Sequence, residues 1–524
     1  MGDWSAHMFR LAALLLPFTL FGQGHALPEG PLSLSEAMES TLREHPLLHA
    51  QEQQVQYSRG AALRAQSQFD RVVSAGASQS RTYTPLSEVE RTLYGATSAA
   101  TNFTSVDAEA TQQFHNGISA GPLLSVTRTS DNVFTVGGLN LSHIGFQVNI
   151  PLLRGRGRDV VGAQEAASGI EVEASLLDLN QTISDLLFNT AVAYWTTVAA
   201  RRSREVYSEA EARGKLLLDT VQTLIEADRI PRSDASEVQA NLADRTASRI
   251  AADQQLLQAK QQLAVAMGLS AESMFTGREA TDPLPAATAG ASPQGDVQAA
   301  IAQALGRRAD YLAAKKRQGG AELLAGAAKN QLKPQLDLQF STGYSGLKDG
   351  LRPDQYILST IDGVHGVDAV GGIRYQFPLE NRAAEGNVLQ TRSTALQAAY
   401  RAQDNARNIA SAVIVAVEGV RSAALQLEKV NQSVAWFQTA LDNEREKYRL
   451  GAGSLVEVLT VEDRLTGVLA AQVQAELGYA VALARLRHGT GTIVDPDKAV
   501  QKVDPAVFLG FPASLPPAGP PAGH

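Results

Sequence analysis

The sequence has no cysteine among its 524 residues. Disulfide bonds and thiolate metal ligands are therefore excluded, and so is a cysteine that would carry a lipid anchor. There is no excess of positive charge either, because 46 Lys and Arg stand against 54 Asp and Glu and give a formal net charge of −8. Proteins that bind nucleic acid usually carry a basic patch, so no nucleic-acid partner is indicated. Stability has to come from packing alone.

Long apolar runs are also scarce. The run at residues 11–21 follows Arg10 and precedes the small residues of Gly24-His25-Ala26. It is too short for a membrane-spanning helix, which needs about 20 apolar residues. The pattern is typical of a signal peptide at residues 1–26, removed after Ala26. We therefore expect an exported protein without a lipid anchor.

Prolines are missing from two long stretches, one between Pro151 and Pro231 and one between Pro378 and Pro496. An interior proline costs a helix about 3 kcal/mol, so such stretches permit long helices. In both, apolar residues recur in steps of three and four, the spacing of coiled-coil packing. We predict long coiled-coil helices at residues 158–228 and 381–450.

Alternating patterns precede these helices. Apolar residues occupy every second position at 144–150, 336–340 and 373–377, and a weaker pattern covers residues 69–84. A period of two with one polar face predicts β-strands. In an exported chain this pattern fits a transmembrane β-barrel, but a soluble antiparallel sheet produces it as well.

The chain is a tandem duplication. Pro151 matches Pro378 at an offset of 227, and Gly268 matches Gly489 at an offset of 221. Each copy is predicted to contain a helix, a strand pair, a long helix and a further helix. The predicted organisation is a signal peptide (1–26), a first repeat (27–275), a linker (276–293), a second repeat (294–493) and a proline-rich disordered tail (494–524).

The first repeat carries about 37 extra residues before Pro151, which we predict to be one long loop. Residues 114–128 are a candidate for a further strand. Both flanking helices must lie on one side of a membrane, however, so each repeat must cross it an even number of times. We assign two crossings to each repeat, or four strands to the chain. A closed barrel needs about eight strands, and open edges in lipid leave backbone groups unpaired, so the chain must oligomerise.

Three motifs stand at the predicted junctions and turns: "IPLLRGRGR", "FPLENRAAEGN" and "KYRLGAGSLVEVLTVEDRL". In their order and spacing, residues 33–493 resemble the TolC-like outer-membrane efflux proteins. The resemblance implies a fold that is mainly α with β: a periplasmic α-barrel of twelve helices joined to a transmembrane β-barrel of twelve strands, completed by trimerisation.

The resemblance also implies a function and partners. The chain would be the passive outer-membrane duct of a tripartite efflux or type I secretion system, and it would be a homotrimer. Its other partners would be a periplasmic adaptor (membrane fusion protein), an inner-membrane pump and outer-membrane lipid. The alternative is an exported coiled-coil scaffold or adaptor without a pore, which leaves the strand pairs unexplained.

Pro151 and Pro378 are predicted to mark the barrel-to-tunnel junction, since proline tolerates a strand end and the turn before a helix. Arg154, Arg156 and Arg158 follow the first of them. We favour a solvated charge cluster at this glycine-rich bend, and binding of anionic lipid is the alternative.

The turn after the second long helix is the predicted hinge. Gly451 and Gly453 supply permissive backbone there, and Ser454 can cap the returning helix. The resemblance implies a periplasmic gate at this turn, lined by acidic residues. Glu457 occupies the matching acidic position, where three copies around one axis would attract cations. An ordinary solvated glutamate is the alternative.

Three further residues belong to this predicted gate. Thr460 stands where the family has a second acidic residue. Tyr448 matches a tyrosine of the family's closed-state lock, although it also fits a heptad core position, and Asp234 stands where the first repeat offers the acidic partner. Gly453 replaces an arginine of that lock.

No enzymatic activity, cofactor or metal site is predicted. His45 and His49 have the spacing of helical metal ligands, but Pro46 lies between them and no further ligand is near in sequence. We predict structural roles for both.

Overall fold

The computed structural model describes residues 30–228, 232–270, 278–286, 297–450, 452–495 and 505–508, without the side chains of Ser233, Asp234 and Ile357. The predicted signal peptide and parts of the predicted linker and tail lie outside these ranges. The chain divides into two compact units. We call residues 49–182 and 304–411 the sheet unit. The helical unit comprises residues 1–48, 183–303 and 412–524.

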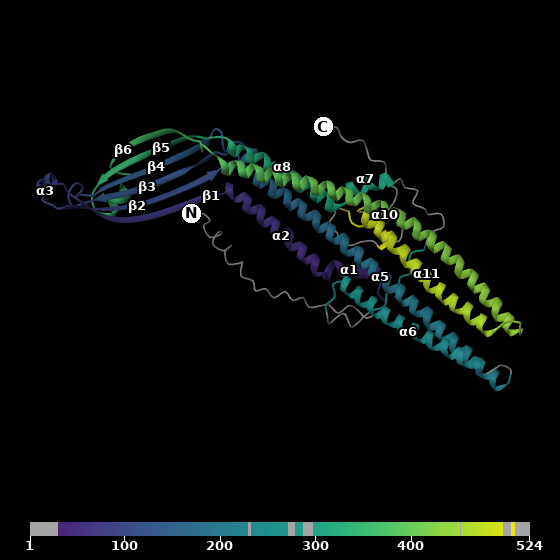
Figure 1. Ribbon diagram of the computed structural model, residues 1–524. Helices are drawn as coiled ribbons and strands as arrows, with labels where there is room; N and C mark the ends of the chain where they lie inside the picture. Colours follow the sequence, from purple (N-terminus) through teal and green to yellow (C-terminus); the bar gives the residue numbers. More distant parts are fainter. Residues whose placement is uncertain are drawn as a thin grey trace. The chain divides into compact units, whose positions relative to one another are not determined.

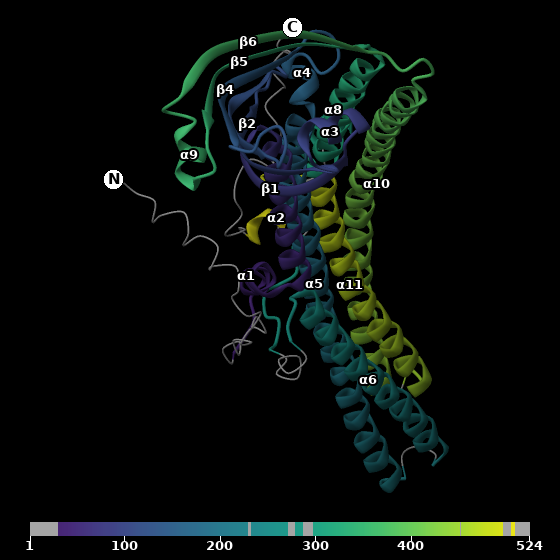
Figure 2. The same ribbon diagram turned by 90° about the vertical axis from the view of Figure 1, so that its left-hand side faces the viewer.

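The sheet unit contains one sheet of six strands in the order β1 to β6, each antiparallel to its neighbours (Figure 1). The strands are β1 (Arg71–Pro85), β2 (Ser98–Gln113), β3 (Ser119–Ser130), β4 (Leu139–Pro151), β5 (Gln335–Asp349) and β6 (Val364–Gln376). The sheet curves strongly (Figure 2).

The prediction of four strands is wrong. The extra residues of the first repeat, predicted to be a loop, form the hairpin of β2 and β3 between the predicted strands. β2 consists largely of Ser, Thr, Ala and Gln, so its alternation in hydropathy is weak. Its backbone nevertheless pairs with β1 and β3, because ladder hydrogen bonds do not require apolar side chains. The number of strands in each repeat stays even, as predicted.

The strands place side chains of opposite character on the two faces of the sheet. One row across all six strands is apolar, and the next row is polar or small. The apolar row is Ala75, Ala108, Leu124, Ile144, Tyr344 and Val367. The adjacent row is Gly76, Asp107, Ser125, His143, Ser345 and Gly366.

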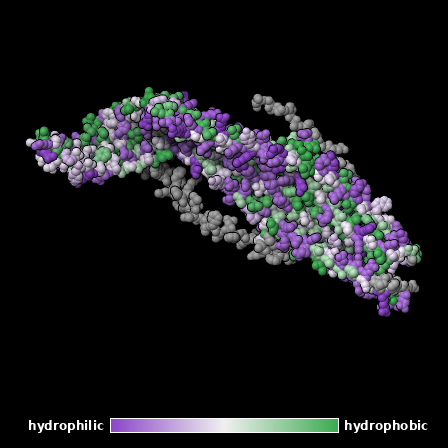
Figure 3. Space-filling view, in the orientation of Figure 1, coloured by the Kyte–Doolittle hydropathy of each residue, from purple (hydrophilic) through white to green (hydrophobic). Residues whose placement is uncertain are grey.

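The polar face is the concave one. A hollow of about 360 Å³ lies on it, lined by side chains that include Thr111, Gln147, Asn149, Gln339 and Ser341. On the opposite face, Ile144 is 47% exposed and Val367 is 82% exposed. Green, apolar residues are visible along the edge formed by β5 and β6 in Figure 3. The sheet therefore has the amphipathic pattern of a transmembrane barrel wall.

Helices continue from the strand ends of the sheet unit. They are α2 (Pro46–Gln66), α4 (Arg158–Val161), the beginning of α5 (Ala163–Glu226), α8 (Ala309–Ala328) and the beginning of α10 (Arg382–Arg449). Arg317 of α8 bonds to Glu171 at 2.8 Å and to Asp178 at 2.6 Å on α5. These hydrogen bonds raise the pKa of Arg317, so the pair of helices is joined by a permanent charge.

Shorter elements cap the strands: η2 (Ser67–Phe69), α3 (Glu88–Tyr94), η4 (Lys329–Leu332) and α9 (Pro353–Leu358). In α3 the N-cap is Ser87, whose side chain accepts from the Glu90 amide while the Glu90 carboxylate accepts from the Ser87 amide. This capping box lets a helix of seven residues form between two strands.

The helical unit contains α1 (Leu34–Glu44), α6 (Ser233–Ala266), α11 (Leu455–Gly489) and the remaining parts of α5, α10 and α7 (Val297–Arg307). The predicted long helices are confirmed as α4 with α5 and as α10, and the predicted break at Pro46 separates α1 from α2. α10 and α11 each contain an 18-residue window apolar enough to cross a membrane. Core helices of soluble proteins pass this test too, and Val413 and Leu483 are buried here.

Tyr194 connects three segments of the helical unit. Its hydroxyl donates to the Leu32 carbonyl at 2.8 Å and accepts from the amides of Thr281 at 3.2 Å and Asp282 at 3.0 Å. Burial raises the pKa of Tyr194 to about 12, so the hydroxyl remains a donor at ordinary pH. Residues 278–286 of the predicted linker thus pack on the N-terminal segment.

The predicted disorder of the C-terminal tail is wrong for four residues. Pro505–Phe508 form η5, which packs on α11, and the Phe508 side chain is fully buried. The prediction rested on the prolines of the tail and left out the apolar group formed by Val507, Phe508 and Leu509.

Candidate functional site

The turn from α10 to α11 is built by a glycine and a capping serine. A Cβ on Gly453 would lie 3.2 Å from the Cβ of Lys447, so a side chain here would require Lys447 to shift by a few tenths of an ångström. Ser454 is the predicted cap. Its hydroxyl accepts from the Glu457 amide at 3.2 Å. Gly451, the other residue of the predicted hinge, lies outside the described residues.

Glu457 completes this cap. Its carboxylate accepts from the Ser454 amide at 3.1 Å, so the two residues form a capping box at the start of α11. Thr460 lies one turn further along, and its hydroxyl donates to the Val456 carbonyl at 2.7 Å. Both side chains are exposed in the single chain. Glu457 therefore has a structural role that leaves part of its carboxylate open to solvent.

Tyr448 lies in the core between the helices. It packs against two apolar clusters, one of which includes Val221, Val238 and Leu455, and the other Leu441. This position agrees with the heptad interpretation. Asp234 begins the first turn of α6, but its side chain is outside the part of the chain that the structure describes. The pairing of Tyr448 with Asp234 therefore stays a prediction.

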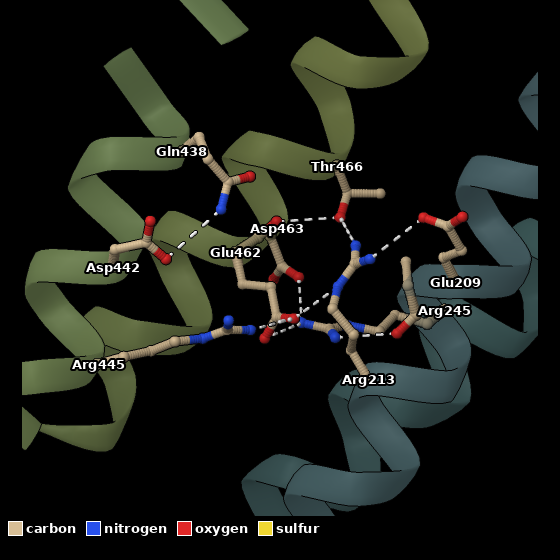
Figure 4. Close-up of polar contacts among 10 residues, drawn as sticks. Glu209, Arg213, Arg245, Gln438, Asp442, Arg445, Glu462, Asp463 and Thr466 are labelled. Carbon is tan, nitrogen blue, oxygen red and sulfur yellow. Dashed lines mark hydrogen bonds and ion pairs between the residues drawn. The ribbon is translucent and has the colours of Figure 1, made fainter. Parts of the chain in front are cut away.

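A buried ion network lies beyond the turn and was not predicted (Figure 4). At its centre, Glu462 of α11 has only 3% of its side chain exposed. Its carboxylate accepts from Arg213 Nε of α5 at 3.0 Å. It also pairs with Arg245 Nη2 of α6 at 3.4 Å and with Arg445 Nη2 of α10 at 3.5 Å.

Neighbouring groups neutralise the arginines of this ion network. Asp463 accepts from Arg245 Nη2 at 3.0 Å and from Asn241 Nδ2 at 2.7 Å. Arg245, which is 6% exposed, also donates to the Ala210 carbonyl at 3.1 Å, and Glu209 lies 3.7 Å from Arg213. The network thus joins α5 and α6 of the first repeat to α10 and α11 of the second.

The ion network is costly to disrupt. Removing one partner of a buried ion pair leaves an uncompensated charge, which typically costs about 3–5 kcal/mol. The same network adds little to stability as long as the helices stay together, because desolvation offsets the attraction between the charges. Its main consequence is specificity for one arrangement of the two helix pairs.

A sequence signal for this network did exist. Arg245 stands seven residues after Val238 and seven before Ala252, and both neighbours are buried. Glu462 likewise follows Leu455 at the heptad interval. An arginine and a glutamate that interrupt apolar heptad stripes on different helices are candidates for a buried pair.

The described residues contain no group of three or more His, Asp or Glu side chains placed to hold a metal ion. His45 is the C-cap residue of α1, where its Nδ1 accepts from the Leu47 amide at 3.2 Å. His49 pairs with Glu52 at 3.1 Å. The two histidines therefore have separate partners.

The second repeat resembles a known protein family. Residues 300–492 match the family model described as outer membrane efflux protein. This region is thus similar to the outer membrane efflux proteins. The predicted resemblance to the TolC-like efflux proteins is thereby confirmed for the second repeat. No curated protein sequence matches the chain.

Solved structures extend the likeness to both repeats of the chain. The outer-membrane channel OprN has 17% identity and a TM-score of 0.64, with 88% of this chain and 90% of that chain covered. CmeC, a Campylobacter jejuni outer membrane channel, has 14% identity and a TM-score of 0.64, with 89% and 87% covered. The Vibrio cholerae outer membrane protein VceC has 16% identity and a TM-score of 0.62, with 87% and 96% covered. The chain therefore has the same fold as these outer-membrane channels.

The two prolines of the predicted junction lie where strands give way to helices. Pro151 is the last residue of β4, and Pro378 lies between the end of β6 and the start of α10. Arg154, the first of the three arginines, donates to the Gln335 side chain of β5 at 2.5 Å. That arginine therefore has a protein partner, which agrees with the favoured interpretation.

Proposed function

We propose that the protein is the outer-membrane duct of a tripartite efflux or type I secretion system. As a homotrimer, it carries substrates passively from a periplasmic adaptor and an inner-membrane pump to the exterior. It resides in the outer membrane and extends into the periplasm, without a lipid anchor.

One observation carries this proposal: a row across all six strands is apolar on the exposed face, and the adjacent row on the concave face is polar or small. A soluble sheet would cover the apolar face with helices. An outward apolar face and a polar interior are instead the features of a barrel that encloses water within lipid. The similarity of residues 300–492 to the outer membrane efflux proteins supports the same conclusion.

The proposed gate is the end of the helical unit at which α10 turns into α11. To open it, the pair α10 and α11 swings away from α5 and α6. This movement separates Glu462 and Asp463 from Arg213 and Arg245, whereas Arg445 moves together with Glu462 because both belong to the moving pair. The charge of Glu462 therefore keeps one partner in the open state, which lowers the cost of opening.

Glu457 and Thr460 would line the entrance, with Tyr448 packed behind them and Asp234 on the neighbouring helix pair. Gly451 and Gly453 would form the hinge, and Pro151 and Pro378 would mark the transition from barrel to tunnel. Three copies of the exposed Glu457 carboxylate around one axis would favour cations over anions.

The proposed function is tested on the purified mature protein. We expect it in the outer-membrane fraction, as a trimer that resists mild SDS, and we expect it to form discrete conductance steps in planar lipid bilayers. A monomer that washes off the membrane and forms no pore would contradict the duct and would support the exported scaffold instead.

The role of Glu457 needs variants that separate its charge from its capping hydrogen bond. Glu457→Gln removes the charge and keeps an acceptor for the Ser454 amide, whereas Ser454→Ala weakens the cap and keeps the charge. We expect reduced cation selectivity and weaker block by multivalent cations in Glu457→Gln and Glu457→Ala, and unchanged selectivity in Ser454→Ala. Equal selectivity in all variants and the wild type would exclude Glu457 from the entrance.

A further inference from the structure

The hairpin of β2 and β3 is the feature of this chain that the resemblance to the TolC-like proteins does not include. It lies in the middle of the sheet, between β1 and β4, and not at an edge. β2 has 16 residues and β3 has 12. A strand that crosses a membrane at a tilt needs about 9–11 residues, so both strands are long enough to cross.

The inner turn of this hairpin is fixed where the helices begin. Gly157 N donates to the Asn116 carbonyl at 3.1 Å. The His115 ring stacks on Phe69 at 3.8 Å and pairs with Glu165 at 3.0 Å. Gly117 has a φ of +94°, and a Cβ there would lie 2.1 Å from the Gly155 carbonyl oxygen, so the turn fits tightly against this bend.

The outer end of the hairpin is fixed to the loop between β5 and β6. Gly350 N donates to the Gly138 carbonyl at 2.8 Å. Arg128 Nη2 donates to the Arg352 carbonyl at 2.8 Å, and Tyr356 Oη donates to the Val126 carbonyl at 2.6 Å. With both ends anchored, β2 and β3 run the full height of the sheet beside β1 and β4.

The hairpin also shares the two faces of the sheet. Ala108 of β2 and Leu124 of β3 lie in the same apolar row as Ile144 of β4. On the polar face, Ser125 Oγ donates to the Asp107 carboxylate at 2.6 Å, which satisfies these groups within the wall. A flap folded into the pore would instead expose its apolar residues to water.

We propose that β2 and β3 are membrane-crossing strands of the barrel wall, so that three copies of six strands close a barrel of eighteen strands. This inference rests on the proposed trimeric channel and changes the size of its barrel. In each copy β1 and β6 lack a second strand partner among the described residues, and lipid does not tolerate such open edges.

Each open edge strand pairs with the opposite edge strand of the neighbouring copy. In a meander of six strands, β1 and β6 run in opposite directions, so β6 of one copy pairs with β1 of its neighbour in the same antiparallel manner as every other pair. Barrel diameter grows roughly in proportion to strand number, and barrels of about 16–18 strands enclose a water-filled channel. The barrel is therefore wider than the twelve-stranded one that the resemblance implies.

Single cysteines test this proposal cleanly, because the chain has no other thiol. Ala108→Cys and Leu124→Cys probe the apolar face of the hairpin, and Ser125→Cys probes its polar face. Ile144→Cys and His143→Cys are the matched controls on β4, one for each face. Each full-length variant is reconstituted in liposomes, exposed to a water-soluble thiol reagent, and separately labelled with a fluorophore that spin-labelled lipid chains quench.

We expect positions 108, 124 and 144 to react at least roughly tenfold more slowly with the water-soluble reagent than positions 125 and 143, since hydrocarbon disfavours the thiolate. Their fluorophores should be quenched by the lipid chains. Rapid reaction at 108 and 124 with lipid quenching retained at 144 would overturn the eighteen-stranded barrel and leave the channel intact. Rapid reaction at 144 as well would overturn the membrane channel itself.

Discussion

At the scale of single residues, the informative positions are charged side chains inside apolar stripes. Arg245 and Glu462 occupy heptad positions that otherwise hold Val, Leu or Ala, and they meet across two helix pairs. A hydrophobic pair would hold these helices together at least as well. We infer that the charges were retained because water can solvate them when the helices separate, which an apolar seam does not permit.

The ion network yields the first prediction. Glu462→Gln leaves Arg213 and Arg245 without their shared carboxylate, while Arg245 keeps Asp463, so the closed arrangement should lose about 1–3 kcal/mol relative to the open one, a shift of about 5–150-fold. We expect more frequent and larger openings in planar bilayers. Arg445→Gln is the control, because its contact with Glu462 stays within the moving helix pair. Trimers of both variants should resist SDS as the wild type does, and identical conductance of Glu462→Gln and the wild type would refute the lock.

Glu211 on α5 gives a prediction about pH. The hydrogen bond from Lys215, together with that from Arg249, holds the pKa of this carboxyl below its ordinary value of 4.5. A lowered folded-state pKa adds stability that is complete above the ordinary value and is lost as the pH falls through the folded-state pKa. Glu211→Gln should therefore lower the apparent Tm at neutral pH and leave it unchanged in strong acid. Glu205→Gln, at an exposed position on the same helix, should leave the apparent Tm unchanged at both pH values. A lower apparent Tm of Glu211→Gln that persisted in strong acid would contradict the electrostatic cause.

At the scale of elements, helices were easier to predict than strands. The proline-free stretches predict α5 and α10, and Pro46 predicts the break after α1, because a missing amide and a steric clash act locally. β2 was missed because its stability comes from partners on other strands. Nothing within Ser98–Gln113 itself distinguishes a strand of small polar residues from a loop. The ion network was missed for a related reason, since only the packing of four helices brings its residues together.

Tyr194 holds α5 to the segment at residues 278–286, and a substitution there tests this contact. Tyr194→Phe removes the donor to the Leu32 carbonyl and leaves the Asp282 amide without its acceptor, whereas the Thr281 amide keeps its bond to the Leu32 carbonyl. Buried unsatisfied groups of this kind cost about 1–3 kcal/mol each. We expect a lower apparent Tm and faster proteolysis near residues 278–286. Tyr400→Phe, at a side chain that is 67% exposed, is the matched control, and equal behaviour of the two variants would contradict the role assigned to Tyr194.

At the scale of the whole molecule, the single chain is incomplete. In the proposed membrane channel, its apolar face and its two strand edges are stable in lipid only when the sheet closes on copies of itself. The sequence alone predicts this need to oligomerise, since no even count of strands below about eight closes a barrel. The number of strands that closes it depends on the inserted hairpin, and therefore only the structure indicates the larger barrel.

Pairing of β6 with β1 of the neighbouring copy can be tested by disulfide crosslinking. Ala369 of β6 and the β1 residues Val73, Ala75 and Ala77 belong to the apolar face, whereas Ser74 of β1 belongs to the polar face. With Ala369→Cys present, oxidation should join copies through at least one of Val73→Cys, Ala75→Cys and Ala77→Cys, because paired residues on one face bring their Cβ atoms within about 4.5–5.5 Å. Ser74→Cys should not crosslink.

A positive control for the oxidation is available within one chain, because Phe146 and Thr342 are partners of β4 and β5. Crosslinking of Phe146→Cys with Thr342→Cys, but of none of the β1 and β6 pairs in an intact trimer, would refute pairing of these edges. Crosslinked species that disappear on reduction would instead show that β6 of one copy continues directly into β1 of the next. Because antiparallel pairing leaves no room for an additional strand between them, that result together with lipid contact at positions 108 and 124 would determine the strand number of the barrel.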